Sequence, residues 1–203
     1  MEVHQEAPPR KSRADAERNR VHILDVAEEF FSEHGVSGAM QDIAKRAGLG
    51  PGTLYRHFPT RESLLAALMQ ARWEELDARR AEIETEPVDP LAALELWLTA
   101  LGDYVTVFDG LPGPIREALR ETTSPLAITC ELLVEITGQF LTAAQTAGYA
   151  RPWVRDRDLV LTVLASKWVS DAQLADEGSA DSLRAIMGEG WHMPPAGPSP
   201  SRT

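Results

Sequence analysis

The chain has 203 residues, of which 43% are hydrophobic, and it carries a formal net charge of −11. This length and apolar content suffice for a hydrophobic core, and the single cysteine excludes an intrachain disulfide. The five histidines are scattered, so the sequence predicts neither a metal site nor a cofactor. The first twenty residues lack the apolar run of a signal peptide, and no later window approaches the ~18 apolar residues of a membrane span. We therefore expect a soluble, cytoplasmic protein.

Positive charge is concentrated near the N-terminus. Residues 10–61 contain nine Lys or Arg and seven Asp or Glu, a local charge of +2, whereas the rest of the chain carries −13. Such an asymmetry is typical of a chain in which one part approaches a polyanion and another faces solvent, although chance clustering gives the same pattern. The acidic part mildly favours neutral or cationic small molecules over anions.

Nearly everything between the two ends has helical periodicity, so the predicted fold class is all-α. Residues 1–13 and 194–203 are polar or rich in Pro, Gly and Ser, and are expected to be disordered tails. A first helix is predicted over residues 15–33, followed by Gly35, and a second over residues 40–47, stopped by Gly48.

A third helix is predicted between Pro51, which suits a first helical position, and Pro59, which ends the helix. At 100° per residue, Leu54 and Phe58 share its inner face. Its outward face presents Thr53, Arg56 and His57, with Tyr55 on the border.

The remaining helices are marked by cap residues and prolines. Thr60 is expected to cap a long fourth helix, and Asp89, Pro114 and Ser124 mark later helix starts. Residues 158–175 are apolar nearly all round, which predicts burial on both sides, and a short helix follows at 179–187. These two helices are expected to build a homodimer by packing with their counterparts as a four-helix bundle.

Two short helices joined by a glycine-containing turn, with small polar and basic side chains facing outward from the second, form a helix-turn-helix arrangement. This motif inserts its second helix into the major groove of DNA. The alternative is a structural helix pair inside an all-α core.

The run GVSGAMQDIAKRAGLGPGTLYRHFPTRESLL, residues 35–65, resembles the DNA-binding motif of the TetR family of bacterial transcriptional regulators. The resemblance rests on the AGLG turn, the Tyr-Arg-His-Phe ending and the TRESLL helix start, and it covers about residues 18–70. It implies a DNA-binding domain over residues 14–60, with the motif at about 39–58, and a helical effector-binding and dimerisation domain over residues 61–190. It also implies a homodimer that a small-molecule effector releases from a palindromic operator in double-stranded DNA. Ala39 departs from the family pattern, in which Ser or Thr often caps the second helix.

The resemblance also implies which residues contact DNA. It places base contacts at Gln41, Pro51 and Thr53, and phosphate contacts at Tyr55, His57, Arg61, Lys45 and Arg56. Each of these has a simpler alternative as a surface or half-buried residue. Arg18 and Arg20 either contact phosphate from the first helix or belong to a solvated run of charges.

Five aromatic residues of the later helices either line an effector pocket or pack the core, because helical spacing fits both roles. They are Trp97, Tyr104, Phe108, Phe140 and Trp168. Cys130 is not expected to act as a redox sensor, because carboxylates such as Glu131 disfavour the thiolate. The sequence contains no glycine-rich phosphate loop and no nucleophile elbow, so an enzyme is not expected.

We therefore predict a sequence-specific, DNA-binding transcriptional regulator, and the resemblance favours a repressor over an activator. The alternative is a DNA-binding regulator whose C-terminal domain only dimerises or binds a partner protein, without a small-molecule ligand.

Overall fold

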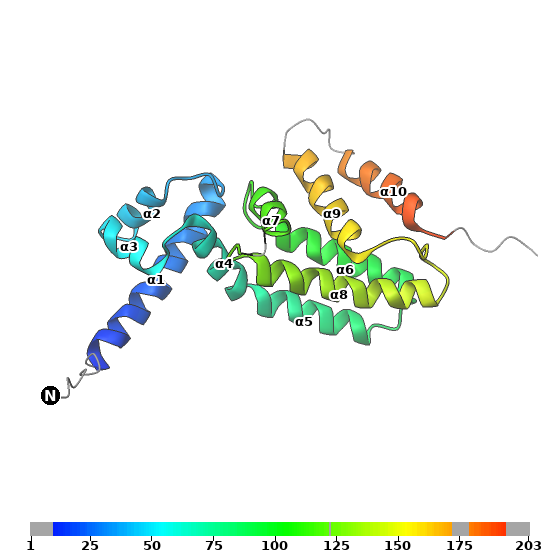
Figure 1. Cartoon of the computed structure of the whole chain (residues 1–203), viewed down its shortest axis with the longest axis horizontal. Coiled ribbons are helices and arrows are strands. Elements are labelled where there is room, and N and C mark those ends of the chain that lie inside the picture. Colours follow the sequence, from blue (N-terminus) through cyan, green and yellow to red (C-terminus); the bar gives the residue numbers. More distant parts are fainter. Residues whose placement is uncertain (1–9, 122, 172–178, 194–203) are drawn as a thin grey trace, which may run out of the picture.

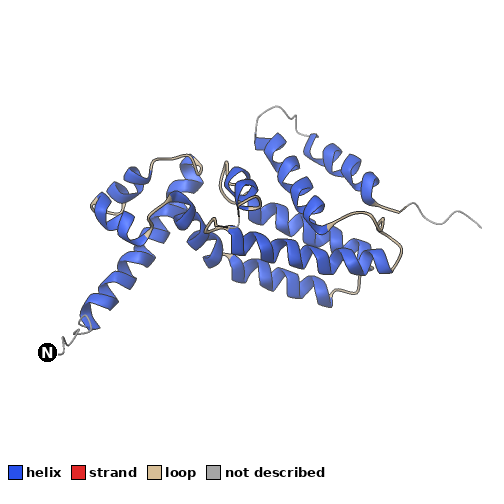
Figure 2. Ribbon diagram, viewed as in Figure 1, coloured by secondary structure: helices blue, strands red, loops and turns tan. Residues whose placement is uncertain are grey.

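The computed structural model describes residues 10–121, 123–171 and 179–193. Within these ranges the chain is helical, as predicted, and the one β-bridge joins Ala150 to His192. Figures 1 and 2 show a small N-terminal group of helices and a larger helical bundle. The helices are α1 (Arg10–His34), α2 (Met40–Arg46), α3 (Pro51–His57), α4 (Arg61–Ala71), α5 (Trp73–Thr85), α6 (Pro90–Val105), α7 (Pro112–Ala118), α8 (Ala127–Thr146), α9 (Asp156–Asp171) and α10 (Ser179–Trp191).

The first helix is longer than expected, because α1 begins at Arg10 and residues 10–13 are therefore not part of a tail. Its first half contains four arginines, two alanines, Lys11 and Glu17, all good helix formers, so the helix extends beyond its buried portion. The predicted tails at 1–9 and 194–203 lie outside the described residues, as do residues 172–175 of the predicted helix at 158–175.

The helix ends follow the capping residues that the sequence predicted. Gly35 and Gly48 have φ of 68° and 66°, the left-handed conformation that ends α1 and α2. The N–H of Leu49 donates to Ala44 O at 2.9 Å, which completes the cap of α2. The hydroxyl of Thr60 accepts from the N–H of Ser63 at the start of α4, and Asp89 caps α6 in the same way. Ala39 makes no side-chain cap.

The predicted long fourth helix is interrupted at Arg72, which separates α4 from α5. The ψ of Arg72 is −5°, and the hydrogen bond from the N–H of Leu76 to Arg72 O is stretched to 3.5 Å. The Arg72 guanidinium donates to Glu28 of α1 at 2.9 Å, so the break occurs where the chain leaves the N-terminal helices.

The centre of the larger bundle is a buried contact between α6 and α8. The indole of Trp97 stacks on Phe140 with ring centroids 5.5 Å apart, and its Nε1–H donates to the buried Thr137 hydroxyl at 2.9 Å. α8 is long and apolar enough to cross a membrane, but half of its most apolar stretch is buried in the protein. We therefore interpret α8 as a core helix.

The N-terminal helices and the bundle meet at the turn between α6 and α7. The N–H of Val36 donates to Asp109 O at 2.8 Å, and the ring of Phe31 packs edge-on against Phe108 with centroids 5.9 Å apart. A Cβ at Gly35 would lie 3.0 Å from the same Asp109 oxygen, so this close approach of the two backbones requires glycine. The α6–α7 turn therefore contacts the chain directly before α2.

Candidate DNA-binding surface and ligand cavity

The α2–α3 pair packs through its inner faces and against α1. The side chains of Ile43, Ala44, Leu54 and Phe58 are buried in the core of the N-terminal helices. Two further contacts come from α1: His22 Nε2 lies 3.1 Å from Ala47 O, and the Arg20 guanidinium lies 4.8 Å from the centre of the Phe58 ring. This cation–π contact gives Arg20 a structural role.

The outer face of the pair presents the residues predicted to contact bases. Gln41 and Pro51 are exposed, and Thr53 is half-buried near the start of α3. Tyr55 is 39% exposed, and His57 is half-buried at the end of α3. Polar groups are thus accessible near the N-terminal ends of α2 and α3, where a recognition helix approaches base edges.

The basic residues of the motif differ in how freely they can reach a phosphate. Lys45 is exposed on α2, one turn after Gln41. Arg56 lies along α3 and donates to Gly52 O at 3.0 Å and, more weakly, to the Thr53 hydroxyl at 3.4 Å. Arg46 instead donates to Glu33 of α1 at 2.6 Å, and this hydrogen bond lowers the pKa of the Glu33 carboxyl.

Arg61, predicted to hold a phosphate, is half-buried and donates hydrogen bonds to the protein backbone. Its Nη1 donates to the carbonyl oxygens of Val36 and, at 2.6 Å, of Gly38. These carbonyls belong to the turn that leads into α2, so Arg61 joins the start of α4 to the start of the motif. No local sequence pattern indicates this arrangement, because the two partners precede Arg61 by 25 and 23 residues.

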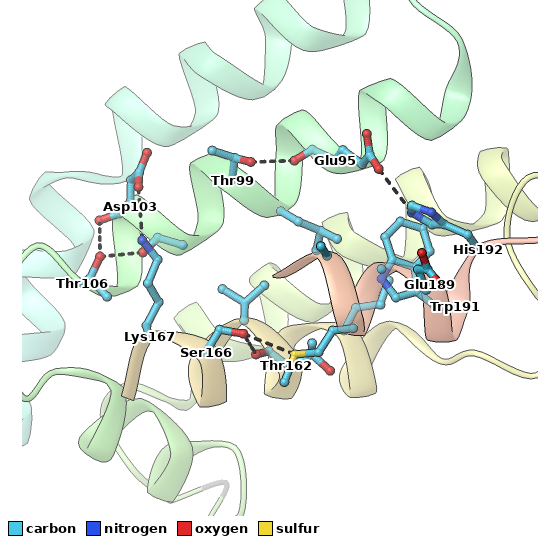
Figure 3. Close-up of a pocket in the computed structure, with 17 residues that line it drawn as sticks. Glu95, Thr99, Asp103, Thr106, Thr162, Ser166, Lys167, Glu189, Trp191 and His192 are labelled. Carbon is cyan, nitrogen blue, oxygen red and sulfur yellow. Dashed lines mark hydrogen bonds and ion pairs between the residues drawn. The ribbon is translucent and has the colours of Figure 1, made fainter. Parts of the chain in front are cut away.

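The bundle contains a cavity of about 700 Å³ between α6, α9 and α10, within the size range of small-molecule sites. Figure 3 shows polar side chains from these helices around it. The polar and aromatic lining residues are Glu95, Thr99, Asp103, Thr106, Thr162, Ser166, Lys167, Glu189, Trp191 and His192.

The aromatic residues predicted to line an effector pocket do not surround this cavity. Trp97, Tyr104 and Phe108 are buried in the core, where the Tyr104 hydroxyl donates to Met69 O at 2.8 Å. Phe140 borders a smaller hollow of about 280 Å³ between the end of α5 and the start of α6. The side chain of Trp168 lies outside the described residues. The first three pack in the core, where each ring contacts an aromatic ring of another helix: Trp97 contacts Phe140, Tyr104 contacts Trp73 and Phe108 contacts Phe31.

Two observations concern thiol chemistry and metal binding. Burial raises the pKa of the Cys130 thiol to about 11, and this environment opposes thiolate chemistry more than the nearby carboxylates do. Over the part of the chain that the structure describes, no group of three His, Cys, Asp or Glu side chains is arranged to hold a metal ion.

Two protein-family models match the chain, one in its N-terminal helices and one in its helical bundle. Residues 23–68 match the family model of the bacterial regulatory proteins of the tetR family, and residues 89–193 match the C-terminal domain of SbtR-like transcriptional regulators. The chain belongs to the TetR family. Its relatives are DNA-binding regulators rather than enzymes, and the protein is a TetR-family transcriptional regulator whose helix-turn-helix is α2–α3.

Several TetR-family relatives align over much of the chain. The regulator UidR from Escherichia coli K12 is 29% identical over 189 residues, which cover 86% of this chain and 93% of UidR. The regulator AcrR from Shigella flexneri is 38% identical over 104 residues, or 48% of this chain and 46% of AcrR. The solved structure of the TetR regulator SCO0520 from Streptomyces coelicolor is 28% identical, covers 85% of this chain and 98% of its own, and superposes with a TM-score of 0.54. RolR, solved in complex with resorcinol, shares the fold with a TM-score of 0.62 at 19% identity, covering 88% of this chain and 90% of its own.

Proposed function

We propose that this TetR-family protein is a dimeric repressor that binds a palindromic operator and leaves it when a small molecule occupies the bundle. The observation that carries the proposal is the α2–α3 pair, whose inner face is buried while Gln41, Lys45 and Pro51 are exposed together with Tyr55. A relative named as a transcriptional repressor, KstR2 from Rhodococcus jostii, is 31% identical over 93 residues, which supports repression over activation.

Within this proposal, base contacts come from Gln41, Pro51 and Thr53, and phosphate contacts from Tyr55, His57, Lys45 and Arg56. Arg61 acts as a positioning residue, because its guanidinium is held by the turn before α2. Phosphate contacts supply affinity for any duplex, whereas base contacts supply preference for one sequence.

A comparison of Thr53→Ala with Thr142→Ala tests the base contacts. Thr142 is an exposed threonine of α8, away from the motif, so its replacement makes the same chemical change without touching DNA. With a duplex that wild type selects, Thr53→Ala is expected to lose preference at one position of each half-site, by roughly tenfold. Fluorescence anisotropy on selected and random duplexes measures this. An equal loss on both duplexes would contradict a base contact at Thr53.

The dimer is proposed to form through α9 and α10. Leu159, Val160 and Leu164 of α9 face the core, but Leu161 remains 38% exposed and Ile186 of α10 remains 69% exposed. Exposed apolar side chains on two neighbouring helices fit a four-helix bundle with a second copy, in which these side chains become buried.

Two isoleucines of nearly equal exposure allow a matched test of the dimer. Ile186 on α10 is 69% exposed and Ile128 on α8 is 70% exposed. Ile186→Glu is expected to give a monomer at micromolar concentration by light scattering, because it places a charge in the proposed interface, whereas Ile128→Glu leaves the dimer intact. A dimer in both variants would contradict an interface that includes Ile186 of α10.

Release from DNA is proposed to run through α6. This helix lines the cavity with Thr99 and Asp103, and the turn that follows it contacts the chain before α2 through the Val36–Asp109 hydrogen bond. A ligand that binds more tightly to one arrangement of α6 therefore shifts the protein toward conformations in which the two helix-turn-helix motifs of the dimer no longer fit the operator. The size of the cavity favours a small molecule over a partner protein as the regulating agent.

A further inference from the structure

The hydroxyl groups around the cavity are arranged as hydrogen-bond acceptors. The side chains of Thr99, Thr106 and Thr162 each donate to the carbonyl oxygen four residues earlier on the same helix, at 2.9, 2.7 and 2.8 Å. A hydroxyl has one proton, so these three oxygens retain only acceptor capacity for a ligand. A ligand that fits them must donate hydrogen bonds.

The charges that line the cavity have an excess of carboxylates. Among the described lining residues, Glu95, Asp103 and Glu189 face one ammonium group, that of Lys167, which gives these residues a formal charge of −2 with His192 neutral. Lys167 Nζ lies 3.5 Å from Asp103 Oδ1, and Figure 3 shows this ion pair with Thr106 at one end of the cavity. Lys167 packs over Gly102, where an added Cβ would lie 2.9 Å from Lys167 Cε and the lysine side chain would have to shift.

The opposite end of the cavity has two carboxylates and, among the described residues, only a histidine opposite them. In Figure 3, Glu95 and Glu189 lie there with Trp191 and His192. His192 Nε2 lies 3.2 Å from Glu95 Oε1, yet this buried nitrogen makes no hydrogen bond. Within the described ranges Glu189 has no ion-pair partner. The buried Nε2 of neutral His192 can accept a hydrogen bond, and the exposed Glu189 carboxylate is unpaired among these residues, so a cation that donates hydrogen bonds to this nitrogen and to the carboxylates fits this end of the cavity.

We propose that the cavity binds an organic cation, a protonated amine attached to an apolar body. The ammonium group lies between Glu95 and Glu189, and the apolar body extends along Leu98, Val163 and Met187 toward the Asp103–Lys167 pair. An ammonium group has three donors and no acceptor, which matches the acceptor-rich lining. The charge-assisted hydrogen bonds at one end set the preference for cations over neutral molecules of the same shape. The inference rests on the proposed ligand-controlled function and specifies the chemical class of its ligand.

Three probes of equal length test the charge preference with the full-length protein: 6-phenylhexylamine, 6-phenylhexanol and 6-phenylhexanoate. Isothermal titration calorimetry and thermal unfolding are measured for each, since a ligand of the folded state raises the unfolding temperature. The amine is expected to bind, the alcohol to bind roughly tenfold more weakly because one charge-assisted hydrogen bond is lost, and the carboxylate not to bind. Equal binding of amine and alcohol, tighter binding of the carboxylate, or no binding of any probe would overturn the proposal.

Variants locate the site. Glu189→Gln and Glu95→Gln are each expected to weaken amine binding roughly tenfold and to leave alcohol binding unchanged, since each removes one charged acceptor. Glu135→Gln is the matched control, because Glu135 is an exposed carboxylate of α8 that does not line the cavity. An amine that binds both cavity variants as tightly as wild type would overturn the assignment.

Binding and regulation are separated by measuring DNA anisotropy with each probe. An amine that binds in calorimetry and leaves the protein on DNA would support the cavity assignment and contradict the proposed release mechanism. An alcohol or carboxylate that binds more tightly than the amine and releases DNA would overturn the charge preference and support the proposed function.

Discussion

The contact between the α6–α7 turn and the chain before α2 makes a sharp prediction about two glycines. Gly35 and Gly48 each follow a helix and have nearly the same φ, 68° and 66°. They differ in their surroundings, because a Cβ on Gly48 meets no atom within 4 Å, whereas a Cβ on Gly35 meets Asp109 O at 3.0 Å and Asp109 Cβ at 3.3 Å. Gly35→Ala and Gly48→Ala therefore separate backbone strain from steric contact.

The expected magnitudes follow from these two terms. Left-handed backbone costs an alanine about 1–2 kcal/mol in either variant. At Gly35 the added methyl group also pushes against backbone of the other part of the protein, which adds about 1–3 kcal/mol, the usual cost of overpacking. Gly48→Ala is thus expected to lower the free energy of unfolding by about 1–2 kcal/mol and Gly35→Ala by about 2–5 kcal/mol.

Urea denaturation followed by tryptophan fluorescence measures both values. The difference between the variants reports the contact with Asp109, because the strain is common to both. Equal destabilisation would refute the close approach at Gly35, and with it the proposed route from α6 to α2.

Three further predictions follow from buried or charged groups. Thr137→Val removes the acceptor of the buried Trp97 Nε1–H and should lower the free energy of unfolding by about 1–3 kcal/mol in urea, while Thr142→Val on the exposed face stays within about 0.5 kcal/mol. Burial raises the pKa of the Cys130 thiol from 9.0 to about 11. The stability that comes from keeping this thiol protonated in the folded protein is therefore complete below pH 9 and is lost as the pH rises to 11. Iodoacetamide at pH 8 should accordingly label Cys130 only in urea, and rapid labelling of the folded protein would refute its burial. Lys45→Ala should reduce the slope of log affinity against log salt by about 1, whereas Arg116→Ala on α7 leaves it unchanged.

The parts of the fold that depend on local sequence were predictable. Gly48 ends α2, Thr60 caps α4 and Asp89 caps α6 because each acts on backbone groups within a few residues of itself. The helix-turn-helix was recognisable for the same reason, since its turn and its proline boundaries occupy one short stretch of sequence.

The features that depend on distant contacts were not predictable. Arg61 donates hydrogen bonds to carbonyls more than twenty residues away, and no local sequence pattern indicates these partners. The aromatic stripe of α6 fits a pocket or a core equally well, and only its packing against α8 places Trp97 in the core. The cavity brings together several residues each from α6, α9 and α10, and none of these segments has a motif that indicates a ligand.

The most direct test of the central claim is selection from a pool of random DNA duplexes by the full-length protein, with anisotropy of the retained sequences at two salt concentrations. The proposed function predicts an enriched palindrome, with an affinity that falls steeply as salt rises because phosphate contacts release counterions. Retention without any enriched sequence, at either salt concentration, would contradict a dimeric regulator that recognises a palindromic operator through α3.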